Sequence, residues 1–164
     1  MYSAALEFLE DEREAFRPYE QLGSLTDEEL ERPTDLEGPA RGWSGRDLVA
    51  HVVGWLEHAL DVARELALGG HSETFERMDR TWDEGLGDQV NADMLERWRA
   101  MPLSEVRHRL ATSPGELRGT LTVVPEARWI KDARLGAFFV GDLIEHDEEH
   151  LPELAAILAS AGRA

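Results

Sequence analysis

Helical periodicity is the feature that most constrains the fold of this chain. Apolar residues recur at intervals of three and four along most of its length, which is the spacing of one helix face. Strand patterns are nearly absent, and the longest β-like run, Leu121–Val124, ends at Pro125. Helices with one apolar face must pack together, so the sequence predicts an all-α helix bundle. At 164 residues the chain has the length of one domain, and we expect residues 1–164 to form it.

Capping and breaking residues bound the predicted helices. The clearest helix begins after Ser44, a good N-cap, and ends at Gly69-Gly70. Pro114 either kinks one helix or separates two helices that lie nearly in line. The acidic segment 71–91 is predicted to be a surface crossover, or else a lid, with one broken helical turn at 75–78. The expected helical ranges are 3–16, 26–30, 44–68, 92–101, 103–111, 113 to before Pro125, and 135–160 with a bend at Pro152.

Charge and composition exclude several classes of function. There are 34 acidic and 17 basic residues, a formal net charge of −17, which disfavours binding to nucleic acid or to an anionic membrane surface. The chain has no cysteine, so it can form no disulfide, thiolate metal site or cysteine nucleophile. No signal peptide and no membrane-spanning segment is predicted, and we expect a cytoplasmic protein.

His146 and His150 form the strongest candidate site. They are four residues apart, so both imidazoles project from one side of one helix, within an apolar stripe that runs from Phe139 to Ile157. An unpaired buried polar group costs about 1–3 kcal/mol, so buried rings need partners. A transition-metal ion bound by neutral imidazoles would supply one. The alternative is a hydrogen-bonded or half-exposed pair. The zincin motif does not fit, because Asp147 stands where that motif has glutamate.

A third ligand can come from the helix that follows Ser44. His51 lies on its inward side together with Trp55, and would meet His146 and His150 if the two helices are neighbours. His58 is the rival, two turns further along the same face. Asp47, one turn before His51, could hold the second ring nitrogen of a ligand, or could simply favour the helix N-terminus.

These residues resemble the DinB-like (DinB/YfiT-like) superfamily of metalloenzymes. The matching segments are Leu25-Thr-Asp-Glu-Glu-Leu-Glu-Arg-Pro33, Arg41-Gly-Trp-Ser-Gly-Arg-Asp-Leu-Val-Ala-His51 and Leu143-Ile-Glu-His-Asp-Glu-Glu-His-Leu-Pro-Glu-Leu154. The resemblance implies an antiparallel four-helix bundle, a divalent metal, usually zinc or nickel, on His51, His146 and His150, and frequent homodimers. It extends to the mycothiol-dependent maleylpyruvate isomerase branch. That branch commonly has glutamate where His146 stands, so this chain is expected to lie closer to the three-histidine members.

Three functions remain open from the sequence. The first is a metal-dependent thiol S-transferase that joins a low-molecular-weight thiol, such as mycothiol or bacillithiol, to a small-molecule electrophile. A metal-dependent hydrolase is its nearest variant. The second is a non-catalytic metal-binding bundle with a role in stress response. The third is a bundle without metal, whose histidines lie apart or pair with acids such as Glu145 or Glu149. An enzyme should have a cavity open to solvent at the metal, whereas a binding module could hold the metal in a closed site.

Overall fold

The computed structural model describes residues 2–163, in which every regular element is helical. No strand occurs in that range, which confirms the all-α prediction. None of the helices described combines the length and apolar composition needed to cross a membrane. In chain order the elements are α1 (Ala5–Phe16), η1 (Arg17–Ser24), α2 (Asp27–Glu31), η2 (Gly38–Ala40), α3 (Gly45–Leu68), α4 (Glu73–Asp83), α5 (Gly87–Arg99), α6 (Leu103–Val123), η3 (Glu126–Arg128), α7 (Ala133–Phe139), the π-helix η4 (Val140–Glu145), α8 (His146–Glu149) and α9 (Leu151–Ser160).

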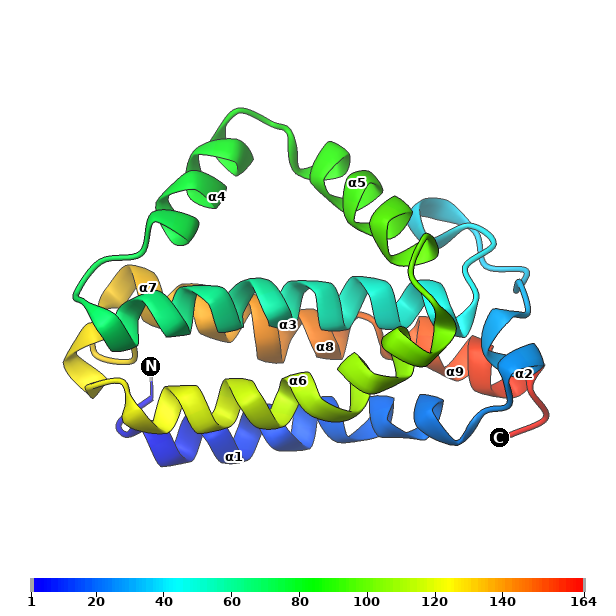
Figure 1. Cartoon of the computed structure of the whole chain (residues 1–164), viewed down its shortest axis with the longest axis horizontal. Helices are drawn as coiled ribbons and strands as arrows, with labels where there is room; N and C mark the ends of the chain where they lie inside the picture. Colours follow the sequence, from blue (N-terminus) through cyan, green and yellow to red (C-terminus); the bar gives the residue numbers. More distant parts are fainter. Residues whose placement is uncertain (1, 164) are drawn as a thin grey trace.

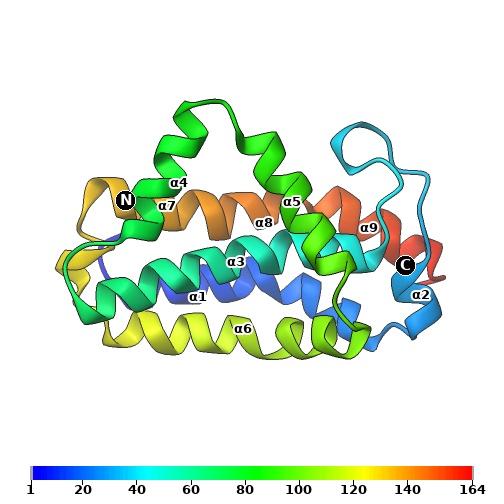
Figure 2. The ribbon, with the colours of Figure 1, turned by 45° about the horizontal axis from the view of Figure 1, so that its top comes forward.

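The runs α1, α3, α6 and α7–α9 lie along the long axis of the molecule (Figure 1). Two of them, α3 and α6, are side by side and point in the same direction, while α1 and α7–α9 point the opposite way (Figures 1 and 2). The cause is an arch made of α4 and α5, which carries the chain from the end of α3 back to the level of its start. The antiparallel arrangement therefore does not hold for α3 and α6, and the four-helix bundle itself stays a prediction.

The central helix is α3, which contacts α6, α5, α4 and α9. Most of its residues are buried, because neighbouring elements pack on several of its sides. At the foot of the arch, Met94 of α5 packs so closely on Gly54 that a Cβ there would have no room. This close approach holds α5 against α3 and sets one wall of the site described below.

Side-chain caps begin α2 and α3 where the sequence predicts them. Ser44 and Asp47 form a reciprocal capping box: the Ser44 hydroxyl accepts from the Asp47 N–H, and the Asp47 carboxylate accepts from the Ser44 N–H. Thr26 and Glu29 do the same for α2. The helix end at Gly69 is also confirmed.

Segment 71–91 is more helical than its sequence predicts. Instead of a crossover with one broken turn, it contains α4 and the first turn of α5. Ser72 caps α4 by accepting from the Phe75 N–H, and Glu65 of α3 accepts hydrogen bonds from the Ser72 and Thr74 hydroxyls. These contacts with α3 stabilise a helix of 11 residues, a length that is marginal for an isolated helix in water.

The structure decides between the two alternatives that the sequence left open at Pro114. α6 continues through Pro114 as one helix, as the first alternative predicts, so the interpretation as two helices is wrong. The region around Pro152 differs from expectation. The predicted helix 135–160 is divided into α7, η4, α8 and α9. One break falls at His150, and Pro152 occupies the first turn of α9, where its missing N–H costs no helical hydrogen bond. The π-helix was not predicted. Its wider turn changes which side of the helix faces α3, and His146 directly follows it.

Candidate metal centre

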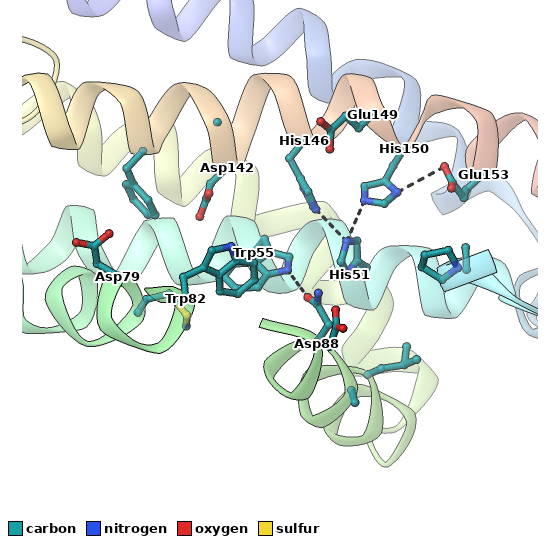
Figure 3. A pocket seen from close by; sticks show the side chains of 18 of the residues that line it. His51, Trp55, Asp79, Trp82, Asp88, Asp142, His146, Glu149, His150 and Glu153 are labelled. Carbon is teal, nitrogen blue, oxygen red and sulfur yellow. Dashed lines mark hydrogen bonds and ion pairs between the residues drawn. The ribbon is translucent and has the colours of Figure 1, made fainter. Parts of the chain in front are cut away.

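Three imidazoles from separate parts of the fold meet at one point. His51 projects from the first half of α3, His146 begins α8, and His150 lies between α8 and α9 (Figure 3). The Nε2 atom of His51 is 2.9 Å from Nε2 of His146 and 2.9 Å from Nε2 of His150. One nitrogen from each ring lies within 4.8 Å of the other two. The alternative in which the histidines lie apart is therefore wrong.

The crowding of these nitrogens fits a cation better than hydrogen bonds. A neutral ring nitrogen carries either one hydrogen or one lone pair, so Nε2 of His51 can make only one ordinary hydrogen bond. It nevertheless has two nitrogen neighbours at 2.9 Å. Two nitrogens that each lie about 2.1 Å from one cation are about 3 Å apart when their bonds meet near 90°. The three rings could thus hold a metal ion between them.

The surroundings keep two of these rings neutral, the form that binds metal. Burial, followed by the neighbouring His146 and His150, lowers the pKa of His51 to about 3. Burial and then His150 lower the pKa of His146 to about 4. The ring of Trp43, 5.1 Å from that of His51 between centroids, covers one side of the cluster and contributes to this burial.

The carboxylate nearest the cluster is Glu153, which sequence reasoning missed. Its Oε2 atom is 3.5 Å from Nδ1 of His150, and neither atom has a hydrogen-bond partner within residues 2–163. Ligand histidines usually donate their second N–H to such an acceptor, which orients the ring. The available signal was the His150-x-x-Glu153 spacing, which places the two side chains on one side of α9.

The carboxylate predicted for that role, Asp47, is engaged elsewhere. One of its oxygens accepts from Ser44 in the capping box, and the other accepts from Nε of Arg99 at 2.8 Å. Asp47 thus helps to start α3, which is the alternative left open by the sequence, and it also links α3 to α5 through Arg99. We find no hydrogen bond between Asp47 and His51 in the described part of the chain.

A cavity of about 1010 Å³ opens beside the histidine cluster, lined by residues of the arch and of the runs α3 and α7–α9. The three histidines line one end of it, together with Trp43. The rest of the lining is mainly aromatic and acidic: Trp55, Phe75, Trp82, Phe138, Asp79, Asp88, Asp142, Glu149 and Glu153 (Figure 3). The metal candidate therefore borders a space large enough for a small-molecule ligand.

Most of the chain matches one known protein family. Residues 9–157 match the family described as mycothiol maleylpyruvate isomerase N-terminal domain. The chain belongs to this family. No curated protein and no solved structure matches the chain.

Membership in the mycothiol maleylpyruvate isomerase N-terminal domain family confirms the DinB-like relationship inferred from the sequence. The match is to the very branch in which glutamate was expected at position 146, although this chain has His146 there. The identity of that one residue was thus a poor guide to the branch. The match includes all three histidines, the whole of α3 and the run α7–α9 as far as Ile157.

Proposed function

We propose that this protein is a metal-dependent thiol S-transferase, with His51, His146 and His150 as ligands of a divalent cation such as zinc or nickel. One observation carries the proposal: three imidazoles converge on the wall of an open cavity rather than in a closed core. Three protein ligands leave further positions free, which is typical of catalytic sites and not of structural ones. A closed, fully ligated site would instead favour the non-catalytic alternative.

The thiol must come from outside, because the chain has no cysteine. The name of its family contains mycothiol, and we propose a thiol of this type as the donor. When bound, a divalent cation lowers the pKa of a coordinating thiol, so that the nucleophilic thiolate is present at neutral pH. His51, His146 and His150 would hold this cation at the end of the cavity, where the donor's sulfur would bind, and Glu153, 3.5 Å from Nδ1 of His150, would orient that ring.

In the transfer, the sulfur of the donor forms a bond to an electrophilic carbon of the second substrate. The leaving group departs with the electron pair of the bond that breaks, and the thiol proton passes to solvent. The aromatic walls of the cavity exclude water around the electrophile and keep its reactive carbon beside the sulfur. In this transfer step the residues named above need only to position the thiol and the electrophile.

The test compares metal-free and zinc-loaded protein, with mycothiol as donor and 1-chloro-2,4-dinitrobenzene as a chromogenic electrophile. We expect transfer above the uncatalysed rate only with zinc, and its loss in His146→Ala. His108→Ala is the matched control, since His108 is exposed on α6 away from the cluster, and should keep full activity. Equal rates with and without zinc, or full activity in His146→Ala, would contradict the proposal. Turnover of an ester without thiol would favour the hydrolase instead.

A further inference from the structure

The far end of the cavity has the chemistry of a cation-binding site. Of the five carboxylic acids in the cavity lining, Glu149 and Glu153 lie beside the histidines, whereas Asp79 and Asp142 lie towards the opposite end (Figure 3). Apart from the histidines, the lining has one basic side chain, Arg134. The guanidinium of Arg134 is already paired, because it donates to Glu76 at 3.2 Å and to Asp79 at 2.7 Å and stacks over Phe75. An anionic ligand would thus find no free cationic side chain on these walls.

Asp142 is the acid best placed to meet a ligand. It lies in the π-helix one turn before His146 and points towards the side of the cavity where Trp55 and Trp82 stand (Figure 3). Within residues 2–163 its carboxylate has no hydrogen bond and no ion pair, and burial alone raises its pKa to about 7. Ionising a half-buried carboxylate without a partner is costly, and a bound cation would remove that cost.

Aromatic rings that line the same cavity as Asp142 add a second, independent feature. Trp55 and Trp82 meet edge to face, with centroids 5.3 Å apart, and Phe138 lines the same space. Faces of aromatic rings attract cations, and cages of such rings are a recurrent way to bind ammonium groups. Trp55 is held in place by donating its Nε1–H to Asn91 of α5 at 2.9 Å, whereas Trp82 is half exposed at the edge. The combination favours an organic cation over a hydrated metal ion, since only the former gains from apolar walls.

We infer that the electrophilic substrate carries an ammonium group, which binds to Asp142 between the rings of Trp55, Trp82 and Phe138. In naming this ligand the electrophile, the inference rests on the proposed transferase function. The ammonium group occupies the far end of the cavity, and the electrophilic carbon of the same molecule reaches the histidine end. The transfer step is unchanged: sulfur bonds to that carbon, and the leaving group takes the electron pair. Asp142 is thus a specificity-determining residue that contacts the substrate.

The test measures binding of three probes of similar size by isothermal titration calorimetry: benzyltrimethylammonium, benzyl alcohol and benzoate. The quaternary cation cannot ligate a metal, so metal-free and zinc-loaded protein can both be used. We expect it to bind at least tenfold more tightly than benzyl alcohol in both forms, and benzoate not to bind the metal-free protein. It should also inhibit transfer to 1-chloro-2,4-dinitrobenzene competitively. Equal affinity for the cation and the alcohol would overturn the inference, as would binding without competition.

Substitutions in the cavity wall identify the side chains that bind the cation. Asp142→Asn, nearly the same in shape, should weaken binding of the cation at least tenfold. Glu149→Gln, an exposed acid on the same wall, should change it less than twofold. Trp82→Leu should also weaken binding, and because Trp82 is 50% exposed its loss does not threaten the fold. Unchanged affinity in Asp142→Asn or in Trp82→Leu would overturn the assignment.

The two proposals fail separately. If the protein takes up no metal or transfers no thiol, binding of the cation to metal-free protein still reports on the far end of the cavity. If transfer occurs but the cation does not bind, only the substrate class proposed here is wrong.

Discussion

Two histidines of the same helix, His51 and His58, lie two turns apart on α3 and have opposite surroundings. The Nε2 atom of His51 lies 2.9 Å from the Nε2 atoms of two other imidazoles, those of His146 and His150. His58 packs against the rings of Trp55 and Phe138, at centroid distances of 5.5 and 6.0 Å. Its Nε2 atom is buried and has no hydrogen-bond partner among the residues described.

Burial does not separate these two sites, because it lowers the pKa of both histidines, to about 3 for His51 and about 4 for His58. The difference lies in what faces α3. At His51 the opposing residues are His146 and His150, after the π-helix, whereas at His58 the opposing residue is Phe138, before it. A buried imidazole becomes a candidate ligand only where the opposite helix supplies others. Among aromatic rings it is a packing residue.

The largest expected effect tests this contrast directly. His51→Ala should weaken zinc binding by orders of magnitude, because two protein ligands remain of three. His58→Ala should leave the zinc affinity unchanged. Competition titration against a chromophoric chelator measures both. A similar loss of affinity in the two variants would mean that the contrast between these histidines is not one of metal binding.

The second prediction concerns the stability of the metal-free protein in acid. The pKa of His58 is about 4 in the folded state and 6.5 without burial, so folding favours its neutral form. Its contribution to stability is complete above pH 6.5 and is lost as the pH falls towards 4. His58→Phe should therefore lose less stability between pH 7 and pH 4 than wild type, by on the order of 2–3 kcal/mol. Urea denaturation across this range with a chelator present measures the difference.

His51 and His146 titrate in both proteins, so they cancel in that comparison. Parallel losses of stability in wild type and His58→Phe would show that His58 is protonated equally in the folded and unfolded states.

The third prediction addresses the partner of His150. Glu153→Gln should reduce the zinc affinity about 10–100-fold, because it removes the carboxylate charge beside Nδ1 of His150 that would orient the ring. Glu149→Gln is the matched control, with an exposed carboxylate on the same run, and should bind zinc as wild type does. Calorimetric titration of the two variants distinguishes them. Identical affinities would leave Glu153 without an orienting role.

The smallest effect is expected at Asp47, one turn from His51. Asp47→Ala leaves the Ser44 cap in place but removes the carboxylate that accepts from the Ser44 N–H and pairs with Arg99, and should lower the free energy of unfolding by about 1 kcal/mol. Zinc affinity should be unchanged, since no hydrogen bond links Asp47 to the cluster in the described residues. Thermal melts and zinc titration of the same sample check both statements. A marked loss of zinc affinity would restore Asp47 as the partner of His51.

Much of the local structure could be predicted from the residues alone. Ser44 with Asp47, Thr26 with Glu29, and the end of α3 at Gly69 depend on neighbours within a few positions, which the sequence displays directly. The arch could not be predicted in the same way. α4 depends on Glu65, which bonds to Ser72 and Thr74 from a different helix.

The candidate site likewise has one part that the sequence predicts and one part that depends on tertiary contacts. The spacing of His146 and His150 places both rings on one side of a helix, and the inward position of His51 made it the natural third member. The sequence did not predict a role for Glu153 or for Asp142. The role of Glu153 depends on its distance from Nδ1 of His150. The role of Asp142 depends on a cavity that forms only when the helices pack together. Asp47 was misjudged in part because Arg99, 52 residues away, takes up its second oxygen.

By itself, the sequence determined the helical class, the caps and the placement of His146 and His150 on one side of a helix, since each follows from periodicity or from side chains a turn apart. Only the tertiary structure decided which imidazole of α3 meets His146 and His150, which carboxylate lies beside the second nitrogen of His150, and which side chains line the cavity. Those outcomes depend on the direction and rotation of whole helices. The direction and rotation of the helices are determined by the packing of many side chains at once. Here they also depend on a π-helix turn that the sequence pattern does not predict.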